Sequence, residues 1–162
     1  MVNVLFVCLG NICRSPTAEG VFRHMVAQAD LADRIAVDSA GTAGYHIGEP
    51  PDLRAQAAAR RRGIDLSGLR GRQAIPDDFR RFHYVLAMDR DNHRDLCRLC
   101  PTGADDRLRL FLEFAPHPTL QDVPDPFYGD ADGFERVLDL IEGASRGLLD
   151  YIRRTDLSSG TS

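Results

Sequence analysis

A cysteine and an arginine lie close together near the amino terminus, in the segment VLFVCLGNICRSPTA (4–18). Cys8 follows an apolar run, and Arg14 comes six positions later. A thiolate is a strong nucleophile, and the planar guanidinium of arginine can hold two phosphate oxygens at once. These residue types predict a site where Cys8 attacks a tetrahedral anion that Arg14 holds. Their spacing alone is weak evidence, because the chain has twenty arginines and a cysteine is easily followed by one at this distance by chance.

The residues around this pair form a strand–loop–helix pattern that suits an anion-binding cup. The run 2–7 is almost wholly apolar, which predicts a strand covered on both faces. Ser15-Pro16 predicts an N-cap and the first residue of a helix. A tight loop between the two directs successive main-chain N–H groups into one concavity. Gly10 and Asn11 are residue types that tolerate the positive φ that such a loop needs.

Cys8 is expected at the base of this cup, where main-chain dipoles stabilise a thiolate. The hydroxyl of Ser15 can donate a hydrogen bond to the same sulfur. The alternative is that Cys8 is an inert buried residue closing the strand and that Arg14 is a surface residue. The combination of strand, loop glycine and helix start favours the reactive site.

A thiolate that attacks phosphorus needs a second group to protonate the leaving oxygen. Asp125 is the best candidate, because prolines flank it and two aromatic residues follow in VPDPFYG (123–129). The alternative is a proline-rich turn in which the aspartate only makes hydrogen bonds. The residues by themselves leave both interpretations open.

Composition and charge exclude several classes of function. The absence of lysine excludes Schiff-base chemistry and the lysine of a nucleotide-binding phosphate loop. The net charge of −4 argues against a nucleic-acid partner. No segment resembles a signal peptide or an apolar membrane span, so a cytoplasmic protein that does not contact a membrane is expected.

Two of the four cysteines, Cys97 and Cys100, form a C-x-x-C pair. Zinc would need two further ligands, and the only nearby imidazole is that of His93, so no metal site is expected. A labile disulfide and a pair of inert thiols both remain open, and inert thiols are favoured.

Apolar periodicity predicts strands that alternate with helices. The fold class is therefore α/β, with three layers: a central parallel four-stranded sheet, helices on both faces and a phosphate-binding loop after the first strand. One domain is expected over residues 1–154, followed by a disordered tail at 155–162. Strands are predicted at 2–7, 34–41, 82–89 and 107–114, with a further short one near 72–74, and helices at 16–29, 50–64, 90–99 and 132–154.

Five segments of the chain stand out as motifs: V-C-L-G-N-I-C-R-S (7–15), D-S-A-G-T (38–42), G-x-x-P-D-x-R (48–54), M-D-x-x-N (88–92) and D-P-F-Y-G (125–129). They resemble motifs of the low-molecular-weight protein tyrosine phosphatases, and the similarity covers residues 2 to 154. The first of these motifs together with the late D-P-[aromatic]-Y-G is highly specific, unlike a bare C-x5-R.

The resemblance implies a protein-tyrosine-phosphatase, a metal-free, cysteine-dependent phosphoric monoester hydrolase without a cofactor. It implies that Cys8 forms a phosphocysteine intermediate and that Arg14 and the loop amides hold the phosphate. Asp125 is implied to protonate the tyrosyl oxygen and then to activate water, while Ser15 aids departure of the sulfur. The phosphate-binding loop comprises Leu9, Gly10, Asn11, Ile12, Cys13 and Ser15.

The resemblance also implies roles around this centre. Asn11 and Ser39 are implied to hold the loop in shape, and Cys13 to form a reversible disulfide with Cys8 that prevents over-oxidation. The implied partners are phosphotyrosine-containing proteins, a tyrosine kinase being one candidate, and the implied state is a monomer or weak dimer. The implied walls of the substrate pocket are Tyr45, Phe127 and Tyr128.

Two positions depart from the family pattern. Tyr45 stands where tryptophan is common, which implies an altered substrate preference. Leu69 stands where a histidine often supports the loop asparagine.

Two rival activities share this fold. Protein arginine phosphatases typically carry threonine where Ile12 stands, so the apolar side chain favours an aryl phosphate. Thioredoxin-coupled arsenate reductases use two further cysteines, for which Cys97 and Cys100 are candidates. The D-P-F-Y-G segment and Cys13 favour the phosphatase.

Overall fold

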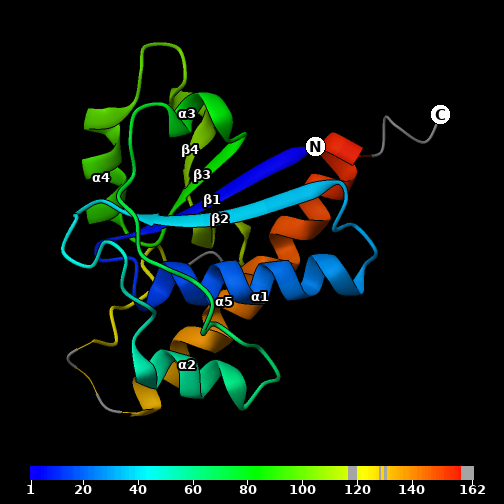
Figure 1. Ribbon diagram of the computed structural model, residues 1–162. Helices are drawn as coiled ribbons and strands as arrows, with labels where there is room; N and C mark the ends of the chain where they lie inside the picture. Colours follow the sequence, from blue (N-terminus) through cyan, green and yellow to red (C-terminus); the bar gives the residue numbers. More distant parts are fainter. Residues whose placement is uncertain (117–119, 128, 130, 158–162) are drawn as a thin grey trace.

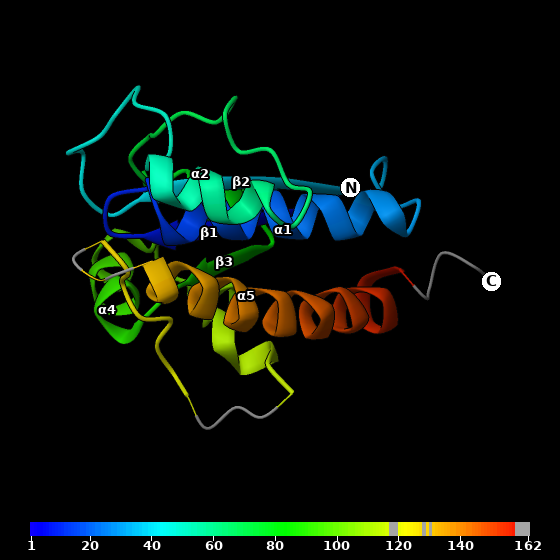
Figure 2. The same cartoon turned by 90° about the horizontal axis from the view of Figure 1, so that it is seen from below.

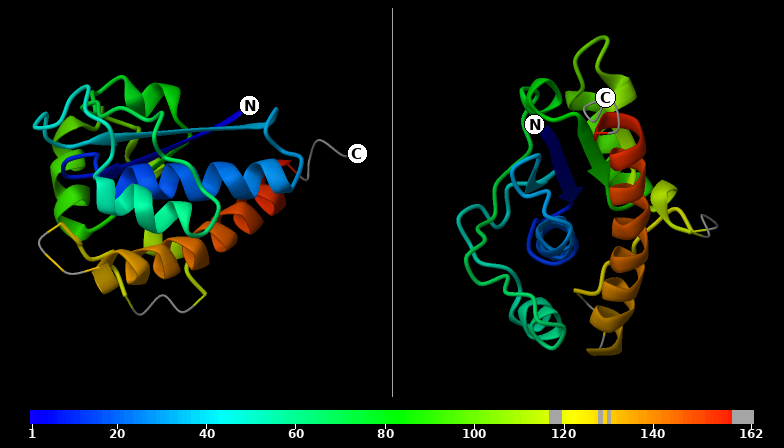
Figure 3. Two further views of the ribbon diagram at one scale, coloured as in Figure 1. Left: turned by 60° about the horizontal axis from the view of Figure 1, so that its bottom comes forward. Right: turned by 90° about the vertical axis from the view of Figure 1, so that its right-hand side faces the viewer.

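The computed structural model describes residues 1–116, 120–127, 129 and 131–157. Within them, four strands form one parallel sheet in the order β2-β1-β3-β4, and helices cover both faces, which confirms the predicted fold class (Figures 1 and 3). No helix in these ranges is both long and apolar enough to cross a bilayer. The elements are β1 (Val2–Cys8), α1 (Arg14–Gln28), β2 (Ile35–Gly41), α2 (Leu53–Arg60), α3 (Asp78–Arg81), β3 (Tyr84–Ala87), α4 (Arg90–Leu99), β4 (Leu108–Leu110) and α5 (Ala131–Ile152).

β1 is buried on both faces, as its almost wholly apolar sequence predicts. Val4 and Phe6 belong to a core that α1, α2 and α5 complete, whereas Leu5 and Val7 belong to a second core with α3 and α4. Figure 2 shows α5 beside α1 and α2 on the first face. Because alternate residues of a strand point to opposite faces, packing on both sides holds β1 rigidly and thereby positions its last residue, Cys8.

The first turn of α1 is part of the loop that follows β1. The helix begins at Arg14, earlier than Ser15-Pro16 predicts, and the N-cap residue Cys13 makes no side-chain capping bond. The hydroxyl of Ser15 instead lies 3.0 Å from the sulfur of Cys8. The prediction of Ser15 as N-cap is therefore wrong, because its hydroxyl contacts the thiol rather than the helix amides.

Two other helices, α2 and α4, begin after a capping aspartate. The side chain of Asp52 accepts a hydrogen bond from the main-chain N–H of Arg54 in α2, and that of Asp89 accepts one from Asn92 in α4. Each carboxylate satisfies a main-chain donor that the helix leaves unpaired. Past α2, Gly63 adopts a φ of 81°, which supports the helix stop that the sequence predicts there.

The run 107–114 is predicted as one strand, but only β4 joins the sheet. β4 pairs with Val85–Ala87 and then gives way to a 3₁₀ turn at Phe111–Phe114. The turn brings the ring of Phe111 edge-on to that of Phe6, with centroids 5.0 Å apart in the first core. The second half of the prediction is wrong because aromatic burial under α5 outweighs the alternating pattern.

Packed structure continues past residue 154, where the sequence predicts the domain to end. α5 leads into a π-helical turn at Arg153–Leu157. The hydroxyl of Tyr84 donates to the carboxylate of Asp156, and Leu157 is buried in the first core. Asp156 and Leu157, which fall in the expected tail, therefore contact the domain, and residues 158–162 lie outside those described.

Candidate active site

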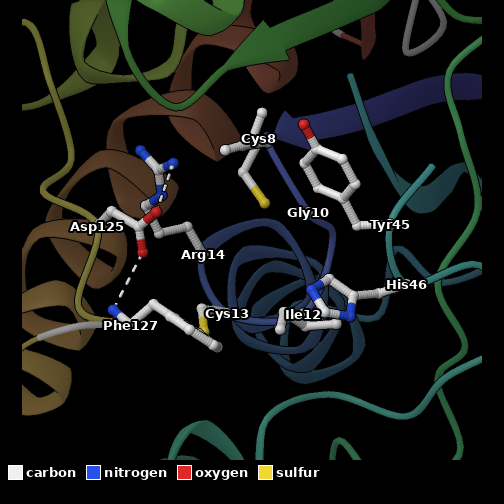
Figure 4. Close-up of a pocket in the computed structure, with 10 residues that line it drawn as sticks. Cys8, Gly10, Ile12, Cys13, Arg14, Tyr45, His46, Asp125 and Phe127 are labelled. Carbon is white, nitrogen blue, oxygen red and sulfur yellow. Dashed lines mark hydrogen bonds and ion pairs between the residues drawn. The ribbon is translucent and has the colours of Figure 1, made fainter. Parts of the chain in front are cut away.

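A cavity of about 130 Å³ opens at the carboxyl end of β1. Cavities of roughly 150 Å³ hold a benzene ring, so there is room here for one aromatic group or a small anion. Figure 4 shows Cys8 and Cys13 between Asp125 and Phe127 on one side and Tyr45 and His46 on the other. The lining residues are Cys8, Leu9, Gly10, Ile12, Cys13, Arg14, Tyr45, His46, Asp125 and Phe127.

The sulfur of Cys8 lies at the base of this cavity, and the residue is only 3% exposed. The main-chain N–H of Asn11 donates to the sulfur at 3.2 Å, and the hydroxyl of Ser15 is 3.0 Å from it. Two donors close to one sulfur stabilise its anionic form, which is the form that attacks electrophiles. The structure thus brings Cys8, Asn11 and Ser15 together as the sequence predicts.

The loop takes its shape from Asn11, which adopts a φ of 58°. Its side-chain amide donates to Ser15 Oγ at 2.8 Å and to Ser39 Oγ at 3.0 Å. Gly10 does not adopt a positive φ, so that part of the prediction is wrong. A Cβ atom at Gly10 would lie 3.1 Å from Cδ2 of His46, so a side chain there would require the imidazole to shift by a few tenths of an ångström.

The oxygen of the Asn11 side chain accepts a hydrogen bond from the main-chain N–H of Arg72 at 3.0 Å. The Arg72 guanidinium makes two bonds to the buried carboxylate of Asp78, which hold this segment in place. Leu69 packs against the first core. The expected strand at 72–74 is reduced to one bridge between Gly41 and Gln73. The support of Asn11 therefore comes from the main-chain N–H of Arg72 and does not require a side chain at the position of Leu69.

Arg14 is 3% exposed and is surrounded by acceptors. Its guanidinium donates to Asp89 at 2.6 Å, to the carbonyl of Val123 at 3.0 Å and to Asp125 at 3.5 Å. Burial alone would lower the pKa of Arg14, but the negative charges of Cys8, Asp89 and Asp125 raise it above the usual value. The group therefore stays cationic and is available to an anion in the cavity.

Asp125 lies at the mouth of the cavity, and its side chain is 41% exposed. One oxygen accepts from the main-chain N–H of Phe127 at 3.1 Å, which directs the other toward Arg14. Arg54 holds this segment from α2, because it donates to the carbonyl of Phe127 at 2.9 Å and lies over its ring. Asp122 accepts from Arg90 at the start of α4. The acid candidate is thus held on both sides.

Asp89, Arg54, Arg72 and His46 are residues near the site to which the sequence analysis assigned no role. Two of them lie in segments that carry the family resemblance: Asp89 in M-D-x-x-N (88–92) and Arg54 in G-x-x-P-D-x-R (48–54). Those motifs indicate that the residues matter, but they do not indicate which residues each one contacts. Only the folded chain brings Asp89 to Arg14 and Arg54 to the Asp125 loop.

The remaining predicted residues are distributed as follows. Cys13 lines the cavity, and burial, together with the charges of Asp52 and Cys8, raises its thiol pKa far above the usual range. Tyr45 lines the cavity although it is 74% exposed, whereas Tyr128 lies outside the described residues. Cys97 and Cys100 are free thiols on and beside α4 and do not line the cavity.

Comparison with known proteins identifies close relatives. The model of the family "Low molecular weight phosphotyrosine protein phosphatase" matches residues 3–158. The chain is 45% identical over 136 residues to the low molecular weight phosphotyrosine protein phosphatase of Homo sapiens, spanning 83% of this chain and 85% of that protein. It is 41% identical over 154 residues to the low molecular weight protein-tyrosine-phosphatase YfkJ of Bacillus subtilis, spanning 95% and 97%. A crystal structure of a protein tyrosine phosphatase from Entamoeba histolytica aligns with a TM-score of 0.92 and 36% identity, over 95% of this chain and 98% of that one.

Proposed function

This chain belongs to the low molecular weight phosphotyrosine protein phosphatase family, and from that premise we propose that Cys8, Arg14 and Asp125 perform its reaction. The protein is a protein tyrosine phosphatase, a cysteine-dependent hydrolase that works through a phosphocysteine intermediate. One observation carries the assignment of roles: the thiol, the guanidinium and the carboxylate line a single cavity.

In the first half of the proposed reaction, the sulfur of Cys8 attacks phosphorus. The S–P bond forms while the bond from phosphorus to the tyrosyl oxygen breaks, and Asp125 gives its proton to that oxygen. Arg14 and the loop amides hold the three remaining oxygens, where charge must be stabilised in the transition state. The hydrogen bond that Arg14 donates to Asp89 keeps the guanidinium aimed at the cavity.

In the second half, water attacks the phosphocysteine. Asp125, now ionised, takes a proton from the water, the O–P bond forms, and the S–P bond breaks to release phosphate. The sulfur regains its negative charge in this step. The donors from Ser15 and from the Asn11 N–H lie within reach of that charge and lower the barrier to its departure.

Three features support an aryl phosphate as substrate. Tyr45 and Phe127 stand on opposite sides of a cavity large enough for one ring (Figure 4). Ile12 gives the cavity an apolar wall. Cys97 lies eight residues after Asp89, the N-cap residue of α4 that contacts Arg14. At 1.5 Å per residue this is about 12 Å along the helix axis. That separation disfavours the thiol relay from Cys97 to Cys8 that an arsenate reductase would need.

Wild-type protein is expected to hydrolyse phosphotyrosine and small aryl phosphates near pH 6 with a chelator present. In the same buffer, phosphate release from phosphoarginine and oxidation of reduced thioredoxin by arsenate measure the two alternatives. Folded, reduced protein that acts on either of these but not on aryl phosphates would contradict the proposed substrate class.

Inactivation by hydrogen peroxide is expected to be reversible with dithiothreitol. Peroxide oxidises the Cys8 thiolate to a sulfenic acid, and the Cys13 thiol then displaces water from it to form a disulfide. Both residues line the same cavity, and the raised pKa keeps Cys13 protonated until then. In the Cys13→Ser variant, inactivation by peroxide should be largely irreversible, which is measured as the activity recovered after dithiothreitol. Full recovery of that variant would exclude the protective role.

The remaining parts of the proposal concern setting and partners. The proposed substrates are phosphotyrosine-containing proteins, as the family implies. The proposals that a tyrosine kinase is one of them and that the protein is a monomer or a weak dimer rest on the family resemblance alone. A cytoplasmic location suits the chemistry, because Cys8 must remain a free thiol. One phosphatase domain is supported by the family match over residues 3–158.

A further inference from the structure

A buried carboxylate, that of Glu19, lies on α1 behind the phosphate-binding loop. The side chain of Glu19 is 5% exposed, and one of its oxygens pairs with Arg23 at 2.6 Å. The other accepts a hydrogen bond from the hydroxyl of Ser39 at 2.7 Å. Arg23 also donates to the carbonyl of Val37 at 2.7 Å, which fixes the direction of its guanidinium. A carboxylate this buried is rare without such a partner.

The charge of Glu19 decides how the hydrogens of its neighbours are arranged. Burial raises the pKa of Glu19, and Asp38 adds to this, whereas the Ser39 hydroxyl and Arg23 oppose it. An ionised carboxylate only accepts hydrogen bonds, so the single hydrogen of the Ser39 hydroxyl must point to Glu19. The Ser39 oxygen is then free to accept from the side-chain amide of Asn11.

The Asn11 amide is held from its other end as well. Its oxygen accepts from the main-chain N–H of Arg72, so the NH₂ group must face Ser39 and Ser15. Asn11 therefore gives one hydrogen to each hydroxyl. Neither orientation can reverse while Glu19 remains ionised and the Arg72 segment stays in place.

This arrangement leaves the hydroxyl hydrogen of Ser15 for Cys8. Because the Ser15 oxygen already accepts from Asn11, its own hydrogen can go only to the Cys8 sulfur at 3.0 Å or to the carbonyl of Ala40 at 3.3 Å. Sulfur is larger than oxygen, so the contact with Cys8 is the closer of the two. The series of hydrogen bonds that begins at Arg23 and passes through Glu19, Ser39, Asn11 and Ser15 thus ends at the nucleophile.

We propose that Arg23 is a positioning residue, which acts through Glu19 to direct the Ser15 hydroxyl toward the sulfur of Cys8. The inference rests on the nucleophile role proposed above for Cys8. Arg23 touches neither substrate nor the reacting atoms. Its effect falls on the steps in which the sulfur carries charge, including its release from phosphorus, because a hydrogen bond to sulfur stabilises the thiolate and not the bound phosphate.

The test compares Arg23→Ala, Arg23→Lys and Glu19→Gln with wild type on a small aryl phosphate, with inorganic phosphate as inhibitor. Loss of one oriented hydrogen bond predicts a fall in kcat of about three- to tenfold for Arg23→Ala and a larger one for Glu19→Gln. KM and the inhibition constant of phosphate should stay within about twofold. Arg23→Lys, which keeps the charge, should recover most of kcat.

Arg146→Ala is the matched control, because Arg146 also pairs with a glutamate four residues away on a helix and is similarly exposed. Its kcat should equal that of wild type. Unchanged kcat in both Arg23→Ala and Glu19→Gln would overturn the inference. So would a rise in KM and in the phosphate constant with kcat unchanged, since that pattern means that the pair only holds the loop. Failure of the proposed function would look different, because wild type itself would then be inactive.

Discussion

Replacement of Cys8 by serine is expected to abolish aryl phosphatase activity while phosphate binding stays measurable. Serine is close to cysteine in size, so the buried site keeps its shape, and Arg14 with the loop amides remains. A hydroxyl without an adjacent general base is a far weaker nucleophile than a thiolate. The expected loss in kcat is at least about 10⁴-fold, the scale seen when a nucleophile is removed.

Two measurements check this prediction. Release of phosphate from an aryl phosphate gives kcat, and calorimetric titration with inorganic phosphate gives the affinity of the cup. Cys97→Ser is the matched control, because it makes the same chemical change at an exposed thiol that does not line the cavity. Turnover by Cys8→Ser at a rate near that of wild type would eliminate Cys8 as the nucleophile.

Replacement of Asp125 by alanine is expected to slow hydrolysis of ordinary aryl phosphates by roughly 10²-fold or more. Without the proton, a phenolate must leave, and this costs most when the phenol is a weak acid. Substrates whose phenol is already acidic need no proton and should be slowed much less. Asp125→Asn, which keeps an acceptor for the main-chain N–H of Phe127, should show the same dependence on the leaving group.

A series of aryl phosphates with leaving groups of increasing acidity separates this role from a structural one. Asp122→Asn is the control, because Asp122 is held by Arg90 in the same segment but does not line the cavity. Displacing the segment should slow every substrate by a similar factor. An equal loss across the series in Asp125→Ala would show that this carboxylate holds the loop rather than supplying the proton.

The nucleophile and its cup could be inferred from one short stretch because they are local. A buried strand that ends in a thiol, followed by a tight loop and a helix start, occupies only the consecutive residues 2–16. Loop amides and a helix N-terminus attract anions wherever they occur. The structure places Cys8, Asn11 and Ser15 in contact as expected, although Asn11 alone adopts the positive φ predicted for both it and Gly10.

The buried polar contacts of the site could not be inferred in this way. Arg14 meets Asp89 across 75 residues and Val123 across 109 residues. The side-chain oxygen of Asn11 accepts its hydrogen bond from the main-chain N–H of Arg72, 61 residues away, and not from a side chain. No local pattern encodes a main-chain partner, because every residue except proline offers the same N–H group.

The sequence by itself predicted the parallel sheet and the family, both of which are confirmed, and it placed Cys8 close to Arg14. Periodic burial, turn residues and a short motif are properties of neighbouring residues, and they can be read without a fold. Only the tertiary structure decided which carboxylate holds Arg14, how Arg54 fixes the Asp125 segment, and that Arg23 and Glu19 stand behind Ser39. These contacts depend on how β1, β2 and α1 pack, since a buried charge or hydroxyl must find its partner among whatever groups packing brings near.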